Sequence, residues 1–193
     1  MNPRGGVPII ACILILTIAA SSSAQKQSPP GNDSTLPERG GSQVFLDRAI
    51  EMSYAEVQLG ELASKKAENP RVKAYAEVLV KDHSAALLKL QKFRTEVITP
   101  VLNSEHTKLK ETLSEKSGTP FDREYLDAMV ADHRVAIRLF EQQIIWNSTG
   151  ESSNRNSIFD TDVTRLVREL LPTLQEHLEH GEQIQMSLPQ TAD

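Results

Sequence analysis

The chain of 193 residues is expected to form one all-α domain: a four-helix bundle with a short extra helix between helices two and three. Its length suits a single domain of about 100–200 residues, and 39% hydrophobic with 24% charged residues is typical of globular proteins. Between residues 44 and 188, apolar residues recur at steps of three and four, and no segment alternates as a strand does. Four amphipathic segments of similar length bury their apolar stripes most simply against one another.

Residues 1–24 have the features of a secretory signal peptide. Arg4 is their only charged side chain, residues 7–20 are almost wholly apolar, and small residues follow up to Ala24. The apolar run is shorter than the about 20 residues of a membrane-spanning helix. Cleavage after Ala24 would give an exported, periplasmic chain without cysteine or transmembrane segment. Acylation at Cys12, and so a lipid anchor, is the alternative.

Residues 25–43 are rich in proline, glycine and polar side chains, and predict a disordered linker. The bundle domain is expected over residues 44–188, with a short tail at 189–193. Asn69-Pro70 and Thr119-Pro120 each place a capping residue before a proline at the first helical position, and Gly118 is expected to end a helix. These signals predict long helices near 44–67, 70–98, 120–147 and 157–188, and a short helix near 104–116.

Each long helix carries one ionisable residue within its apolar stripe: Glu56, His83, His133 and His177 in turn. His83 and His133 each come 13 residues after the proline that opens their helix, and Glu56 comes 11 residues before the end of the first helix. At 1.5 Å per residue, these offsets place the side chains about 17–20 Å from the end of the bundle. We therefore expect the four residues to converge near its middle.

The segments around two of these histidines repeat an Asp-His-x-x-Ala-aliphatic pattern 50 residues apart, which suggests two related helical hairpins. Asp82 and Asp132 precede His83 and His133. Each could accept a hydrogen bond from a histidine of a neighbouring helix, or could be a solvated flank.

Several buried ionisable groups cost free energy unless they are satisfied, so two interpretations stay open for the cluster. It could bind a transition metal or a small polar ligand; imidazole with carboxylate suits zinc, copper, iron or nickel, and residue type does not choose among them. It could instead be a hydrogen-bond network that satisfies itself and sets the helix register. Of the other histidines, His106 is expected to pack within the short helix and His180 to lie on the surface.

The chain lacks the signs of several functional classes. Its formal net charge is −5 and no long basic run occurs, which argues against a nucleic-acid partner. No nucleophile motif, glycine-rich phosphate loop or His-Glu-x-x-His pattern is present, so a non-catalytic role is favoured over an enzyme.

A family resemblance rests on a set of residues spread over the domain: Ala55-Glu56, Asn69-Pro70, Asp82-His83, Ser117-Gly118, Phe121-Asp122, Tyr125, His133, and Leu171-Pro172-Thr173-Leu174 followed by His177. With them the chain resembles the bacterial domain-of-unknown-function family 4142 (DUF4142) over roughly residues 44–188. The resemblance implies a ferritin-like fold, a bacterial envelope setting and a recurring set of Glu56, His83, His133 and His177, without an established activity. The Glu-x-x-His pattern of ferritin-type di-iron sites does not occur.

Taken together, the sequence predicts an exported four-helix bundle that holds a metal or small polar ligand at mid-core. The alternative is a structural or interaction module of the bacterial envelope, with an envelope protein as its partner.

Overall fold

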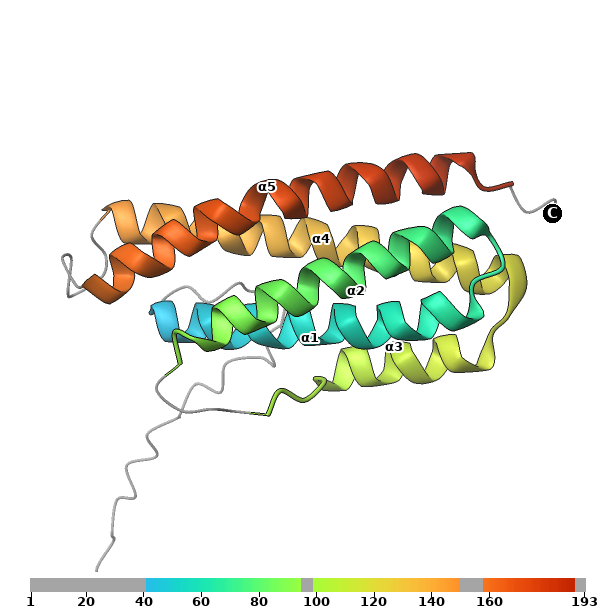
Figure 1. Ribbon diagram of the computed structural model, residues 1–193, viewed down its shortest axis with the longest axis horizontal. Helices are drawn as coiled ribbons and strands as arrows, with labels where there is room; N and C mark the ends of the chain where they lie inside the picture. Colours follow the sequence, from blue (N-terminus) through green and yellow to red (C-terminus); the bar gives the residue numbers. More distant parts are fainter. Residues whose placement is uncertain (1–40, 95–98, 150–157, 190–193) are drawn as a thin grey trace, which may run out of the picture. The chain divides into compact units, whose positions relative to one another are not determined.

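The computed structural model describes residues 41–94, 99–149 and 158–189. This part of the chain is built of helices and contains no strand, which confirms the predicted all-α class (Figure 1). The helices are α1 (Ser42–Lys66), α2 (Pro70–Gln91), α3 (Ser104–Glu115), α4 (Gly118–Thr149) and α5 (Ile158–Ser187). The predicted signal peptide, residues 25–40 of the predicted linker and residues 190–193 of the tail lie outside the described residues.

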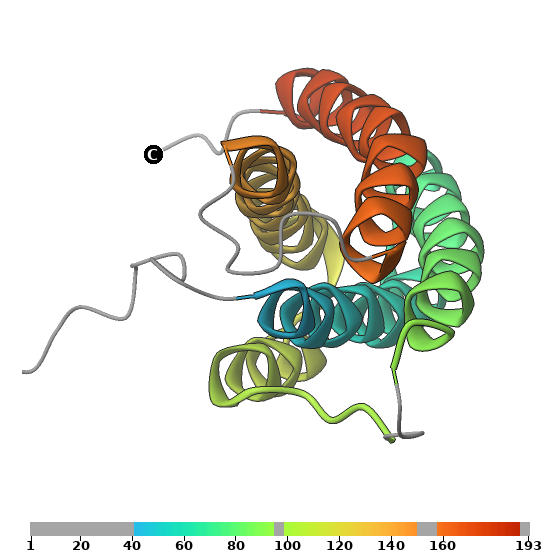
Figure 2. The same cartoon turned by 90° about the vertical axis from the view of Figure 1, so that its left-hand side faces the viewer.

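The four long helices form a bundle of two antiparallel hairpins. α1 packs closely on α2 and α4 on α5, while α1 also borders α4 and α2 borders α5 (Figure 2). α2 and α4 therefore occupy opposite corners. The two copies of the 50-residue repeat lie on this diagonal pair. α2 is the second helix of its hairpin and α4 is the first helix of the other, so the repeat does not match the two hairpins helix by helix in chain order.

The short helix α3 lies outside the bundle, against α1 and α4, and sets the direction of α4. Where α3 begins, the Asn103 backbone N–H donates to Glu51 Oε1 at 3.0 Å; where it ends, Lys66 Nζ donates to the Ser114 carbonyl. α3 thus runs parallel to α1 and returns the chain to the end of the bundle at which α2 began. As a result, α2 and α4 run in the same direction.

A cap shared between helices aligns α2 with α4. The Asn69 side chain accepts a hydrogen bond from the Arg71 N–H, the expected cap of α2. The Asp122 carboxylate of α4 accepts from the backbone N–H groups of Glu68 at 3.2 Å and Asn69 at 2.8 Å. Because the first turn of α4 is thereby bonded to the start of α2, residues at equal distances along the two helices lie at similar heights.

Four helix boundaries differ from the prediction by two residues or more, and one of them is the end of α4, at Thr149 instead of 147. α1 begins at Ser42, inside the predicted linker. α2 ends at Gln91 and not at 98, because the sequence that follows contains four β-branched residues and then Pro100, which disfavour the helical conformation. Gly118 opens α4 where it was expected to end a helix. Its φ of +65° is a left-handed conformation that reverses the chain between α3 and α4.

The apolar core consists of two clusters at different heights. One contains Leu59, Leu79 and Met129 with their neighbours, and the other contains Ile50, Leu90 and Ala136 with theirs. On every long helix, the ionisable residue of the stripe lies between the segments that supply the two clusters. The buried polar residues therefore form one layer between two apolar ones. None of the helices described here is long and apolar enough to cross a membrane.

Candidate metal site

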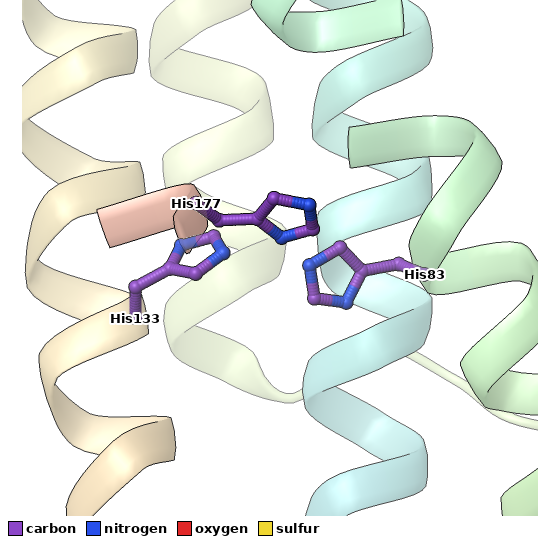
Figure 3. Close-up of side chains that lie close together, drawn as sticks. All are labelled: His83, His133 and His177. Atoms are coloured by element: carbon purple, nitrogen blue, oxygen red, sulfur yellow. The ribbon is translucent and has the colours of Figure 1, made fainter. Parts of the chain in front are cut away.

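Three histidines from three helices meet inside the bundle (Figure 3). His83 of α2, His133 of α4 and His177 of α5 each offer a ring nitrogen, and these nitrogens lie within 4.8 Å of one another. The ring centroids are separated by 5.3–5.4 Å. All three side chains are buried, and His133 is 0% exposed.

Two of the three imidazole rings are oriented by hydrogen bonds to oxygen atoms outside the histidine cluster. His133 Nδ1 donates to the Met129 carbonyl at 2.8 Å, so Nε2 carries the lone pair. His177 Nε2 donates to Asp82 Oδ2 at 3.1 Å, so Nδ1 carries it. Neither lone-pair nitrogen has a hydrogen-bond partner among the described residues. Asp82 thus contacts a histidine of a neighbouring helix, and its role beside a bound metal stays a prediction.

The fourth corner of the layer belongs to Glu56 of α1, which is 3% exposed. Its Oε1 lies 3.3 Å from His133 Nδ1, and its Oε2 lies 4.0 Å from His83 Nε2. Both nitrogens of His83, and Glu56 Oε2, have no hydrogen-bond partner in the described part of the chain. The structure thus brings together the four residues that the sequence predicted; their binding of a metal stays a prediction.

Burial controls the protonation of this layer. Desolvation lowers the pKa of His83 well below its usual value, lowers that of His133 to about 4, and also lowers that of His177. The imidazoles are therefore neutral at pH 7, the form that ligates metals. Desolvation, with a contribution from Asp132, raises the pKa of Glu56. A bound cation would reverse that effect by favouring the carboxylate.

His106 of α3 is buried as expected, but it is more than a packing residue. Its Nδ1 lies 2.8 Å from Glu51 Oε1 on α1, and its Nε2 lies 3.6 Å from Asp132 Oδ2 on α4. Burial alone would lower its pKa, but the bonds to Asp132 and Glu51 outweigh burial and raise the pKa to about 10. The imidazolium therefore connects α3 to the bundle. The sequence suggested that Asp132 could orient a cluster histidine or be a solvated flank; its carboxylate faces His106 of α3 instead.

The comparisons with known proteins agree with the family resemblance. The model of a family described as a domain of unknown function, DUF4142, matches residues 23–184. The chain belongs to this family. The DUF4142 chain gives no match among the curated proteins.

A solved structure shows the same fold. The crystal structure of a DUF305 fragment from Deinococcus radiodurans is 13% identical to the DUF4142 chain, with a TM-score of 0.60. The match covers 76% of this chain and 96% of the fragment. At this identity, the likeness concerns the helical fold alone.

Three contacts around the cluster of Glu56, His83, His133 and His177 were not predicted from the sequence of this DUF4142 protein. They are the Met129 carbonyl, the pairing of Glu51 with His106, and a bond from the Tyr75 hydroxyl to the His177 carbonyl at 3.0 Å. Gly181 makes room for the last one, because a Cβ there would lie 2.9 Å from the Tyr75 oxygen. The exposed position of His180 agrees with the prediction.

Proposed function

We propose that this DUF4142 protein binds one divalent first-row transition metal at mid-bundle, through His83, His133 and His177, with Glu56 as a carboxylate ligand. The observation that carries the proposal is the direction of the lone pairs. Two imidazoles are oriented by a carbonyl and a carboxylate so that their free nitrogens face the third imidazole, whose own nitrogens have no hydrogen-bond partner among the described residues (Figure 3). Metal-binding histidines are typically held in this way, with the second nitrogen donating to an oxygen.

The donor set suits zinc, copper, iron or nickel, since all four accept imidazole nitrogen and carboxylate oxygen. Three nitrogens at about 2.0–2.1 Å from a tetrahedral ion are about 3.3 Å apart. The ring nitrogens, now within 4.8 Å of one another, would move inward by about 1 Å. Glu56 would compensate part of the positive charge of the ion.

The competing proposal is a polar layer that only fixes helix register. Such a layer gains its stability by pairing its own polar groups. Here the buried atoms without a partner in the described part of the chain include both His83 nitrogens, one nitrogen each of His133 and His177, and Glu56 Oε2. Each unpaired buried group costs about 1–3 kcal/mol, so a ligand accounts for this layer better than self-pairing does.

Metal analysis tests the proposal directly. Protein purified without a histidine tag is incubated with a mixture of zinc, copper, iron and nickel, dialysed, and analysed for metal. We expect one metal ion per chain in the wild type and in His180→Gln, which removes an exposed imidazole, and loss of that ion in His133→Leu. Failure of the wild type to retain any of the four metals, or full retention by His133→Leu, would contradict the proposal.

We further propose that the protein is exported to the periplasm, where it holds metal without catalysing a reaction. Support comes from the signal-peptide features of residues 1–24. Mass spectrometry of the mature chain should find Gln25 at its start and no acyl group. A chain that begins with lipidated Cys12 would instead place the bundle on a membrane anchor.

A further inference from the structure

A pocket of about 230 Å³ opens between α2 and α5 and reaches the histidine layer. Its lining includes the buried side chains of His83 and His177 and the half-buried Ala86 and Thr173. His83 is 5% exposed, and neither of its ring nitrogens has a partner among the described residues. An unpaired buried imidazole therefore lines a pocket that is open to solvent.

Acidic side chains surround the mouth of this pocket. Asp82, bonded to His177, and exposed Glu176 both line it. The lysine on the same rim, Lys89, is paired with Glu169 at 2.7 Å. The pocket is thus lined by two carboxylates, and its one ammonium group is paired with a third carboxylate, which favours a cation over an anion at the mouth.

The opposite side of the histidine layer is closed. There α3 covers the groove between α1 and α4, with His106 held between Glu51 and Asp132. The layer therefore has one acidic, open side and one covered side.

We propose that the α2–α5 pocket is a second, transient site for a hydrated divalent transition-metal cation, held by Asp82 and Glu176 on its way to and from the buried histidines. At about 30 Å³ for each water molecule, the pocket volume of about 230 Å³ suffices for an ion with about six waters. His177 connects the two sites, since one ring nitrogen bonds Asp82 and the other faces the cluster. The inference rests on the proposed function, because it assigns the route to the proposed metal site.

The first test obstructs the pocket with a larger side chain. Zn²⁺ uptake is followed by stopped flow with a fluorescent zinc chelator, and Zn²⁺ release is followed after addition of excess chelator. Ala86→Leu should slow uptake and release several-fold by the same factor and leave the dissociation constant unchanged, because it obstructs the route and not the final site. Ala131→Leu, which adds the same bulk at an exposed position of α4, should keep wild-type rates.

The second test removes charge from the mouth without touching the core. Glu176→Gln should lower the association rate of Zn²⁺ by about three- to tenfold at low salt, and by less at high salt, because screening weakens the attraction. Glu111→Gln makes the same chemical change on the exposed face of α3 and should leave the rate unchanged. Since Glu176 is exposed, this variant keeps the proposal testable even if Ala86→Leu does not fold.

The outcomes separate this inference from the function on which it rests. If wild-type protein binds Zn²⁺ and both pocket variants keep its rates, the metal site stands and the route is wrong. The same conclusion follows if the controls slow binding as much as the pocket variants do. If the wild type takes up no Zn²⁺, both proposals are overturned.

Discussion

Replacing His83 with leucine distinguishes a metal ligand from a polar layer that only sets register. Leucine fills a similar volume and removes two buried ring nitrogens that lack partners among the described residues. Each such nitrogen costs about 1–3 kcal/mol. Metal-free His83→Leu is therefore expected to be at least as stable as the metal-free wild type, and more stable by about 1–3 kcal/mol if the leucine packs well.

The effect of metal should be the opposite. An ion that binds only the folded state stabilises it by about 2.7 kcal/mol at a hundredfold excess over the dissociation constant. For a domain of about 150 residues, that free energy raises the melting temperature by roughly 5–10 °C. In His83→Leu this metal-induced rise in melting temperature (the metal increment) should be lost or greatly reduced, because one of the three imidazoles is missing.

Thermal melts measure both effects. Untagged wild type and His83→Leu are each melted with chelator and with excess zinc, copper, iron or nickel. His180→Leu serves as the matched control, because it removes an exposed imidazole on the same helix as His177 and should keep the metal increment. The reasoning fails if no metal moves the wild-type melting temperature, or if His83→Leu shows the same rise as the wild type.

Three further predictions follow from individual contacts. The pKa of His106 is about 10 in the folded protein and 6.5 for a free histidine. The wild type should therefore be more stable than His106→Gln by about 1–3 kcal/mol below pH 6.5, and this difference should disappear between about pH 6.5 and 10. Urea denaturation across this range measures the difference, and a gap that widens with pH would contradict the ion pairs. Asp82→Asn should weaken metal binding about 10- to 100-fold in chelator competition, because the imidazole it orients is released; unchanged affinity would remove Asp82 from the site. Gly181→Ala should destabilise the fold by about 1–2 kcal/mol in thermal melts, since the new methyl group crowds the Tyr75 hydroxyl; a more stable variant would show that the space is not needed.

Much of the fold was predictable because its signals are local. The helical period of apolar residues and the proline that opens α2 predicted the helices, and the structure confirms the all-α class. The four polar residues of the middle layer could be identified for the same reason. The residue number along a helix gives the height of a side chain in the bundle, at 1.5 Å per residue. Its place in the apolar stripe predicts that the side chain points toward the core.

The end of α2 and the role of Gly118 were harder to predict from the sequence. Whether a helix stops depends on a small free-energy difference between extending the helix and turning the chain, so competing local signals are hard to weigh. The apolar period continued beyond Gln91, yet the helix ends there. Gly118 was recognised as a break, but only the path from α3 into α4 shows that it opens a helix.

The amino-acid sequence by itself determined that four amphipathic helices would bury one glutamate and three histidines at one level. Only the tertiary structure decided that α3 covers α1 and α4 and that the groove between α2 and α5 stays open. It also decided that Asp82 accepts a hydrogen bond from His177 while Asp132 forms an ion pair with His106. The two aspartates occupy equivalent places in a sequence repeat, so no local pattern separates them. Their partners are 95 and 26 residues away along the chain, and packing alone brings each pair into contact.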